Sequence, residues 1–363
     1  MNDVTELKQF VVVHAKAQNI PAERYERVLA QITSDGDGPG SWVHEWSRDG
    51  DELELEGKLP EAIRSYAMAR FPYVDGPPRQ RALDRCAELF ERWRRTQPGI
   101  ERVDVQLPGG DVGAWAAGLS DTDPRPLLLV CGGIVSIKEQ WAPLLALADR
   151  LGMAMVVTEV PGTGTNTLRY DAESWRMLPA LLDALAGRAK VEETYAVALS
   201  FSGHLALRAA GHDPRLRGLV LAGAPVQDFF TDADWQRALP RITVDTLAHL
   251  TGVPAGELGT ELAGWVLKDE ELAALDVPVA CTVSLRDEII PAGDVERLRA
   301  NLPSLRLHTY DDVHASPRHV AETRLWNVRA VLRMRGGYGV PHALLDVLLT
   351  LMGARRRLLG PPR

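Results

Sequence analysis

Ser200 stands at a point in the sequence where a serine side chain could act as a nucleophile. It follows the apolar run 196–199 and precedes a helical pattern that begins at Phe201. A strand, a sharp turn and a helix expose such a serine above a sheet, with small residues two positions to either side, usually as G-x-S-x-G. Here Ala198 and Ser202 hold those positions. The motif alone fits equally well a polar residue at the junction of a buried strand and a helix.

The residue types that activate a serine follow later in the chain. Asp287 and Glu288 come just after the predicted strand 278–284, and His314 lies in a loop after the predicted strand 304–310. A histidine accepts the serine proton, and an acid holds that histidine in the required tautomer and stabilises the imidazolium. We therefore predict a triad of Ser200, His314 and Asp287, with Glu288 as the second choice for the acid.

A glycine-rich turn offers the hydrogen-bond donors that this chemistry needs. The apolar run 126–131 ends in the sequence CGGI, which contains Gly133 and Ile134. Backbone amides on such a turn stabilise a developing oxyanion, and glycine lets a substrate come close. We predict an oxyanion hole made by the amide of Phe201 and the amide of Gly133 or Ile134. The alternative is an ordinary Gly-Gly turn with no role in catalysis.

Several other side chains are candidates for the surroundings of the site. His308 is predicted to be half-buried in a strand, and His319 to face solvent at the start of a helix. His204 lies one helical turn beyond Ser200 and is expected to pack inside the fold more readily than to face a pocket. The candidate pocket residues are His204, Gln227, Trp235 and Tyr73.

The elements that must position these residues change in character along the chain. Residues 1–98 show helical periodicity, and the breakers at 36–40 and 76–78 divide them into four predicted helices. Residues 99–340 alternate short β-rich runs with helical stretches, which predicts a mostly parallel sheet with helices on both faces. The eight predicted strands cover 101–107, 112–118, 126–131, 153–159, 194–199, 217–223, 278–284 and 304–310.

Two further segments complete the predicted organisation. Residues 227–275 read as several short helices inserted between the sixth and seventh strands, and such an insertion commonly forms a cap. Residues 341–363 contain an apolar helix followed by three arginines at 355–357. We interpret this tail as a helix docked on the body, and a contact in a homodimer is the alternative.

Composition excludes several classes of function. The 363 residues are 45% apolar, which is enough for a large globular core. A net charge of −8 leaves no basic surplus for nucleic acid or an anionic membrane surface. The three cysteines are far apart, and no signal peptide or membrane-spanning run is apparent, so we expect a cytoplasmic protein. No metal-ligand cluster or phosphate loop is apparent, and we expect no cofactor.

Five motifs carry a resemblance to the α/β-hydrolase superfamily, which has the chain order serine, acid, histidine. They are CGGIVSIKEQW (131–141), EVPGTGTN (159–166), ALSFSGHLALR (198–208), RDEIIP (286–291) and DDVHASP (311–317). Within the superfamily the sequence resembles the group related to the fermentation-respiration switch protein, the FrsA-like esterases. Residues 42–73 are similar to the N-terminal helical domain of that group. The resemblance implies the same roles for Ser200, His314 and Asp287.

The family resembled includes ester hydrolases and carbon–carbon hydrolases, so the resemblance does not choose the bond that is broken. We expect a serine hydrolase that cleaves an ester, a thioester or a β-diketone through an acyl-enzyme on Ser200. A closed, mostly apolar pocket roofed by residues 1–98 and 227–275 predicts a medium-sized hydrophobic, polyketide-like substrate. The alternatives are a non-hydrolytic cyclase, lyase or acyltransferase of secondary metabolism, and an inactive binding or scaffold protein.

Overall fold

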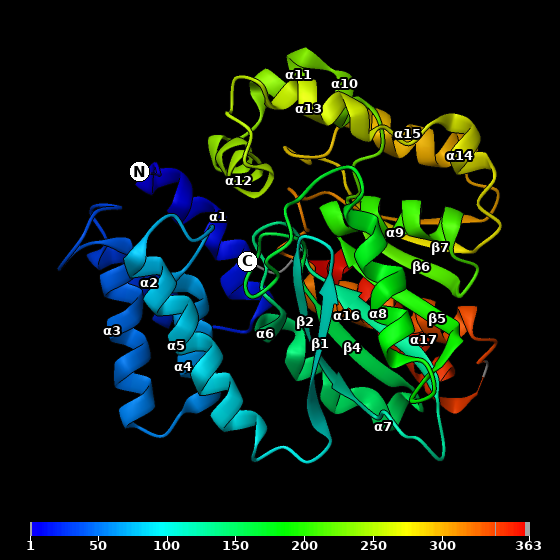
Figure 1. Cartoon of the computed structure of the whole chain (residues 1–363), viewed down its shortest axis with the longest axis horizontal. Coiled ribbons are helices and arrows are strands. Elements are labelled where there is room, and N and C mark those ends of the chain that lie inside the picture. The colour runs from blue at the N-terminus through cyan, green and yellow to red at the C-terminus, as the bar shows by residue number, and fades with distance from the viewer. Residues whose placement is uncertain (1, 338, 360–363) are drawn as a thin grey trace.

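A single eight-stranded sheet forms the centre of the computed structural model, which describes residues 2–337 and 339–359. The strand order is β1-β2-β4-β3-β5-β6-β7-β8 (Figure 1). β2 runs antiparallel to its neighbours β1 and β4, and the pairs from β4 to β8 are parallel. The predicted α/β-hydrolase sheet is thereby confirmed. The strands are β1 Ile100–Leu107, β2 Gly110–Ala117, β3 Pro126–Cys131, β4 Ala154–Thr158, β5 Lys190–Leu199, β6 Leu216–Ala222, β7 Val279–Ser284 and β8 Leu305–Tyr310.

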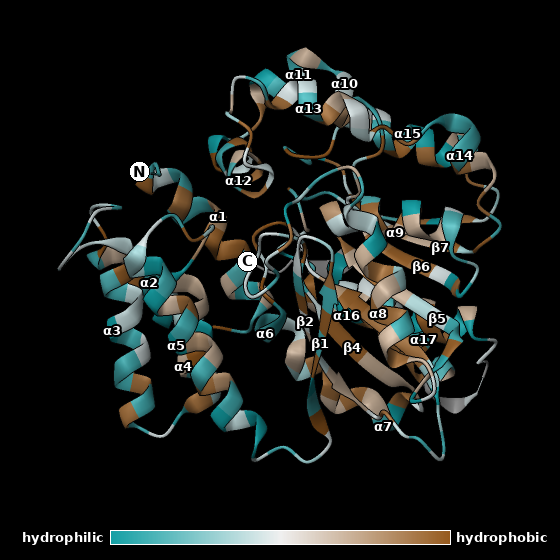
Figure 2. Ribbon diagram, in the orientation of Figure 1, coloured by the Kyte–Doolittle hydropathy of each residue, from teal (hydrophilic) through white to brown (hydrophobic). Residues whose placement is uncertain are grey.

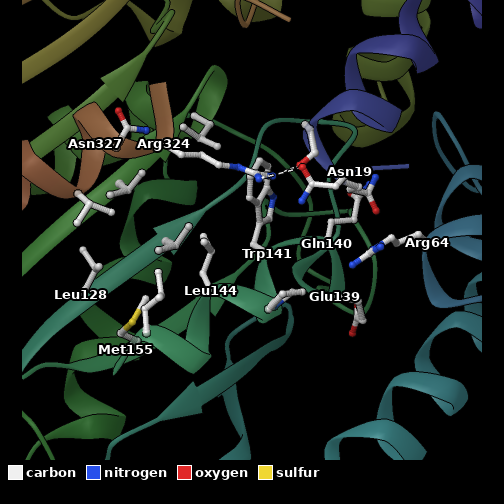
Figure 3. A pocket seen from close by; sticks show the side chains of 18 of the residues that line it. Asn19, Arg64, Leu128, Glu139, Gln140, Trp141, Leu144, Met155, Arg324 and Asn327 are labelled. Carbon is white, nitrogen blue, oxygen red and sulfur yellow. Dashed lines mark hydrogen bonds between the residues drawn. The ribbon is translucent and has the colours of Figure 1, made fainter. Parts of the chain in front are cut away.

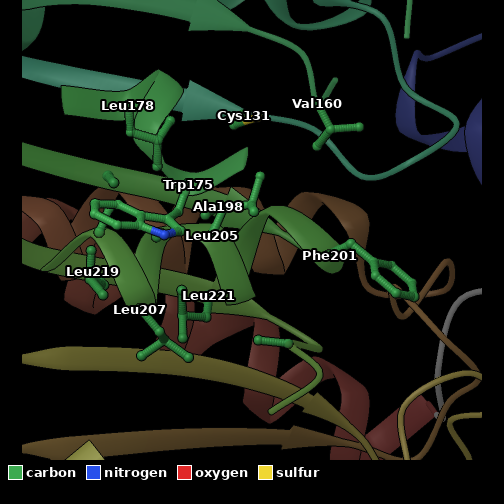
Figure 4. Packing of buried hydrophobic residues seen from close by; sticks show 14 of the residues in the cluster. Cys131, Val160, Trp175, Leu178, Ala198, Phe201, Leu205, Leu207, Leu219 and Leu221 are labelled. Atoms are coloured by element: carbon green, nitrogen blue, oxygen red, sulfur yellow. The ribbon is translucent and has the colours of Figure 1, made fainter. Parts of the chain in front are cut away.

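The central strands are apolar on both faces because helices cover both sides of the sheet. All six residues of β3 are buried, as expected for a parallel strand between two helical layers. α8 (Met177–Leu185) and α9 (Phe201–His212) cover one face, and α16 (Val320–Met334) covers the other (Figures 1 and 2). On the first face, aliphatic side chains of α8 and α9 pack against those of β5 and β6 (Figure 4).

The N-terminal region is helical, and its core continues onto the second face of the sheet. Between residues 2 and 98 the structure has five helices, so the prediction of four was wrong. Tight turns at Asn19 (φ 56°) and Gly57 (φ 74°) interrupt segments that read as continuous in the sequence. The helices are α1 Val4–Ala17, α2 Ala22–Gln31, α3 Trp42–Leu55, α4 Leu59–Ala69 and α5 Pro77–Arg94.

The remaining helices lie around the carboxyl ends of the strands and behind the sheet. Those of the insertion after β6 arch over the strand ends, with α12 beside α1 (Figure 1). They are α10 Asp228–Thr231, α11 Ala233–Ala238, α12 Arg241–Thr251, α13 Leu258–Leu262, η3 Ala263–Trp265 and α14 Asp269–Ala273. The others are α6 Lys138–Trp141, η1 Ala142–Leu147, α7 Ala148–Leu151, η2 Ser174–Arg176, α15 Ala292–Asn301 and α17 Val340–Leu359.

The tail helix α17 packs on α16, where Arg356 of α17 meets Glu322 of α16 at 3.3 Å. Residues 360–363 of the predicted tail lie outside the described residues. Along residues 2–337 and 339–359, no helix combines the length and the apolar character that a membrane crossing requires.

Candidate active site

Ser200 sits on the sharp turn between β5 and α9. Its backbone has φ 58° and ψ −127°, a region that residues with a side chain rarely adopt. The Ser200 N–H donates to the Ala222 carbonyl at 2.7 Å, and its own carbonyl accepts from the Gly203 N–H at 2.8 Å. Strain of this kind persists only where the surroundings enforce it, and it is concentrated at functional sites.

The residues around the turn are as small as the close packing demands. Ala198 is buried, and the Ser202 hydroxyl donates to the Cys131 carbonyl at 2.9 Å and to the Leu199 carbonyl at 3.0 Å. A Cβ on Gly203 would lie 2.6 Å from the Cβ of Ala224. The packing of the turn therefore requires a glycine at position 203, directly after Ser202. The departures from G-x-S-x-G therefore leave the turn intact.

Of the three residues predicted as a triad, His314 lies within hydrogen-bond distance of both Ser200 and Asp287. His314 Nε2 is 3.0 Å from Ser200 Oγ, and His314 Nδ1 is 2.9 Å from each carboxylate oxygen of Asp287. The Asp287 carboxylate also accepts the backbone N–H groups of Ile289 and Ile290 at 2.9 and 2.8 Å. Glu288 accepts the backbone N–H of His314 at 3.0 Å and so holds the loop rather than the imidazole.

The predicted oxyanion donors border the Ser200 hydroxyl. A Cβ placed on Gly133 would lie 3.2 Å from Ser200 Cβ and 3.7 Å from Ser200 Oγ, so only glycine leaves room for a substrate there. Phe201 is the first residue of α9, and its N–H has no acceptor within the helix. Gly133, Ile134 and Phe201 all line the same cavity as Ser200.

This cavity has a volume of about 130 Å³ and a mostly apolar wall. α1 contributes Phe10, Val13, His14 and Ala17 to it, the segment after α4 contributes Phe71, and α12 contributes Ile242 and Thr243. Segments far apart in the sequence therefore surround the hydroxyl.

Family membership follows from a match over most of the chain. A family model described as esterase FrsA-like matches residues 13–279. The chain belongs to the FrsA-like esterase family.

Individual relatives extend this result. Esterase FrsA of Citrobacter koseri is 26% identical over 262 residues, which are 67% of this chain and 62% of that protein. Esterase FrsA of Photobacterium profundum is 24% identical over 278 residues, covering 69% of this chain and 66% of the relative. The chain therefore spans slightly less than two thirds of the length of these FrsA esterases.

Solved structures show the same fold. The structure of wild-type AbyA5 is 54% identical, with a TM-score of 0.93, and the match covers 97% of this chain and 100% of that one. A 2,6-dihydroxy-pseudo-oxynicotine hydrolase is 19% identical, with a TM-score of 0.72 over 88% of this chain and 96% of that one. This second likeness extends to the fold alone.

The structure does not bring the candidate pocket residues Gln227, Trp235 and Tyr73 of this FrsA-like chain to the Ser200 cavity, and it buries His204 inside the fold, the placement expected for it over a place in the pocket. None of them is among the residues around the Ser200 cavity, because each is held elsewhere. His204 Nε2 is 2.7 Å from the Trp265 carbonyl, and the Trp235 indole donates to the Ile289 carbonyl at 2.9 Å. The Gln227 N–H donates to Asp294 at 2.8 Å, and the Tyr73 ring stacks on His249 at 4.6 Å.

Of the two other histidines, one was predicted correctly. His308 is half-buried, as expected. His319 is 5% exposed, so the expectation that it faces solvent was wrong. Its ring stacks on Tyr310, with the ring centroids 4.4 Å apart, which covers it from water.

Sequence reasoning missed His14, which reaches the Ser200 cavity from α1. Its signal was its place on the apolar stripe of α1, three residues after Val11, which is completely buried. Burial, with smaller contributions from the charges of Arg70 and His314, lowers the pKa of His14 to about 3. The imidazole is therefore neutral at working pH and is available as a hydrogen-bonding group.

Sequence reasoning also missed a group of buried charges behind the 133–135 turn. Lys138 Nζ lies 2.9 Å from Glu159 and 3.0 Å from Glu139, and its backbone N–H also donates to Glu159. Burial alone would lower the pKa of Lys138, but the two carboxylates raise it, so the ammonium stays charged. Arg70 of the N-terminal region donates to the Val135 carbonyl of the same turn. These contacts fix the turn that carries Gly133.

The pKa of His314 determines how activity depends on pH. Burial disfavours the imidazolium, but the Asp287 carboxylate, its hydrogen bond and Glu288 together raise the pKa of His314 above its ordinary value of 6.5. Only neutral His314 accepts a proton, so kcat/KM for a neutral ester should rise with pH and reach half its maximum above pH 6.5. A pH–rate profile checks this, and a midpoint at or below 6.5 would contradict it.

Proposed function

We propose that this chain is a serine hydrolase that cleaves a carbonyl compound through an acyl-enzyme on Ser200. The observation that carries the proposal is the 3.0 Å contact between Ser200 Oγ and His314 Nε2 at a strained strand-to-helix turn. An exposed serine is a weak nucleophile until a neighbouring base takes its proton, and this contact provides that base. Membership of the FrsA-like esterase family supports the same reaction class.

The reaction follows from the positions of the three side chains. His314 takes the Ser200 proton as Oγ attacks the carbonyl carbon, and the oxyanion accepts hydrogen bonds from the backbone amides of Phe201 and the 133–134 turn. When the tetrahedral intermediate collapses, His314 returns the proton to the departing alkoxide, thiolate or enolate carbon. Water then loses a proton to His314 and attacks the acyl-enzyme, and Ser200 leaves with that proton as the acid is released.

The wall of the cavity favours an apolar substrate around the reacting carbonyl. Around Ser200 the cavity is lined mainly by apolar side chains of α1, α12 and the 133–135 turn. The reacting end of a medium-sized hydrophobic ester, thioester or β-diketone of polyketide-like character fits this lining. Intact-protein mass spectrometry with a fluorophosphonate tests the nucleophile, because the probe should add once, at Ser200. A folded protein that stays unlabelled would count against the proposal.

The apolar lining of the cavity also favours a second candidate function. A lyase, cyclase or acyltransferase needs His314 as a base and the same oxyanion donors, and it gains from a site that excludes water. The products tell the two apart, since hydrolysis incorporates one oxygen atom from ¹⁸O-labelled water into the released acid and these reactions incorporate none.

His14 should contribute to substrate binding through its neutral imidazole. Replacing it by phenylalanine keeps the bulk and removes the hydrogen bond, so KM should rise about tenfold, the cost of one buried hydrogen bond, while kcat changes little. Steady-state kinetics with a series of esters measures both constants. The exposed His44 gives a matched control, since H44F should change neither. Unchanged kinetics in H14F would contradict this role.

A further inference from the structure

A second and larger cavity lies beside the Ser200 cavity on the face of the sheet that the N-terminal helices cover. Its volume is about 390 Å³. Leu128 and Val130 of β3, Met155 of β4 and Val197 of β5 form its floor, and residues of α4, α5, η1 and α16 form its walls. Figure 3 shows Leu128, Leu144 and Met155 on one side of Trp141. Most of this lining is apolar.

The two cavities adjoin, because Ala17, Trp141 and Leu199 line both. Leu199 immediately precedes Ser200. Since Leu128 pairs with Tyr195 and Val130 with Val197, the floor runs down the strands away from the nucleophile. Tyr195 lies four residue steps before Leu199, which corresponds to about 13 Å at 3.3 Å per step.

The sizes of the two cavities decide where the body of a substrate can lie. Sites for medium-sized ligands have volumes of about 300–1,000 Å³. The Ser200 cavity, at about 130 Å³, is too small, whereas the second cavity, at about 390 Å³, falls within that range. A medium-sized substrate with its carbonyl at Ser200 therefore needs the space behind Trp141.

Two arginines give this second cavity a chemical preference. Arg64 of α4 and Arg324 of α16 both line it. Arg324 donates to the Asn19 side chain at 3.3 Å and to the Ala17 carbonyl (Figure 3). Among the described residues, no carboxylate forms an ion pair with Arg64 or Arg324. Burial and the charge of Arg64 lower the pKa of Arg324. The acid in the lining, Glu139, is already paired with Lys138 at 3.0 Å.

We propose that the cavity behind Trp141 binds the apolar body of the substrate and that Arg64 and Arg324 bind a carboxylate or phosphate group on it. The proposal rests on the proposed function, because it assigns this space to the same substrate whose carbonyl meets Ser200. It narrows the substrate class to an apolar acyl compound that carries an anionic group outside the reacting bond. Guanidinium groups without a carboxylate partner are suited to such an anion.

A binding experiment without turnover tests the cavity directly. Fluorescence titrations use 8-anilinonaphthalene-1-sulfonate and its uncharged counterpart N-phenyl-1-naphthylamine, with Ser200→Ala protein so that no reaction intervenes. Both probes should bind with one site per chain. Decanoate, decyl phosphate or both should displace the sulfonate probe, according to which anion the arginines accept. Displacement by neither compound would overturn the assignment of the arginines.

Two kinds of variant separate the apolar part from the charged part. Leu144→Trp in η1 and Val328→Phe in α16 each add bulk to the lining of the cavity, and each should weaken the binding of both probes at least about tenfold through overpacking. The double variant Arg64→Gln/Arg324→Gln should weaken the sulfonate at least about tenfold and leave the uncharged probe unchanged, because it removes charge-assisted hydrogen bonds only. The matched control Arg81→Gln/Arg355→Gln changes two exposed arginines and should alter neither affinity.

Turnover measurements test whether the second cavity binds the substrate that reacts at Ser200. In Leu144→Trp and Val328→Phe with Ser200 intact, kcat/KM for 4-nitrophenyl decanoate should fall at least about tenfold, and that for the acetate should stay near wild type. Probe binding that survives both filling variants, or equal losses for the two esters in folded protein, would overturn the proposal. A wild-type chain that cleaves neither ester while still binding both probes would contradict the hydrolase function and leave the cavity supported.

Discussion

Replacing Ser200 by alanine should lower kcat/KM for aryl esters at least about 10³-fold, because the variant has no atom to form the acyl-enzyme. The remaining oxyanion donors and the binding cavity would still support a small residual rate. The loss should lie in kcat, since Ser200 Oγ contributes little to binding the substrate in its ground state. Steady-state kinetics measures the fall in kcat, and the loss of fluorophosphonate labelling shows independently that the nucleophile is gone.

The neighbouring Ser202 supplies the matched control for this substitution. Its hydroxyl lies behind the turn, where it donates to the Cys131 and Leu199 carbonyls. Ser202→Ala should therefore cost about 1 kcal/mol of stability, the usual worth of such a hydrogen bond, and leave labelling at Ser200 intact. If Ser200→Ala kept near wild-type activity while Ser202→Ala lost it, the assignment of the nucleophile would be wrong.

The strand ends could be predicted from the sequence because the parallel strands are buried on both faces and read as uninterrupted apolar runs. Ser200 and Asp287 each follow such a run, whereas His314 follows the edge strand β8, which is only partly buried and carries polar residues. Because the carboxyl ends of parallel strands meet at one edge of a sheet, the order of the predicted strands placed these three residues at one edge before any distance was known. The lengths of the strands were less certain, and β5 begins at Lys190, ahead of the predicted 194.

The residues that close over the site could not be predicted in the same way. Helical periodicity shows that one face of α1 is buried, but it does not show that this face meets Ser200. The contact of His14 with the cavity depends on how α1 docks against α12 and the sheet. The same gap explains the error at Trp235, because α11 has no buried residue and lies outside the cavity wall.

The buried charges behind the 133–135 turn show a second limit of prediction from the sequence. Lys138, Glu139 and Glu159 come from two motifs that lie about twenty residues apart in the sequence, and each reads as an ordinary polar residue. Only their pairing at 2.9–3.0 Å makes their burial tolerable, since an unpaired charge there would cost several kcal/mol. A sequence pattern contains no information on such a pairing across space.

Replacing Asp287 by asparagine should lower kcat about 10³–10⁴-fold while the fold remains intact. Asp287 accepts a hydrogen bond from the His314 Nδ1–H at 2.9 Å, which keeps Nε2 unprotonated and able to take the proton of Ser200. An amide side chain supports the other tautomer, in which Nε2 carries the proton. It also removes the main charge that raises the pKa of His314, so the acid limb of the residual activity should move to lower pH.

Glu288→Gln distinguishes the two neighbouring acids. Glu288 binds the backbone N–H of His314 at 3.0 Å, an interaction that a glutamine oxygen preserves. Activity should therefore fall less than about tenfold, and the acid limb should move only slightly, because Glu288 is a smaller contributor than Asp287 to the raised pKa. A large loss in Glu288→Gln with full activity in Asp287→Asn would reverse the roles of the two carboxylates. The imidazole would then need to turn toward Glu288 before Ser200 could be deprotonated.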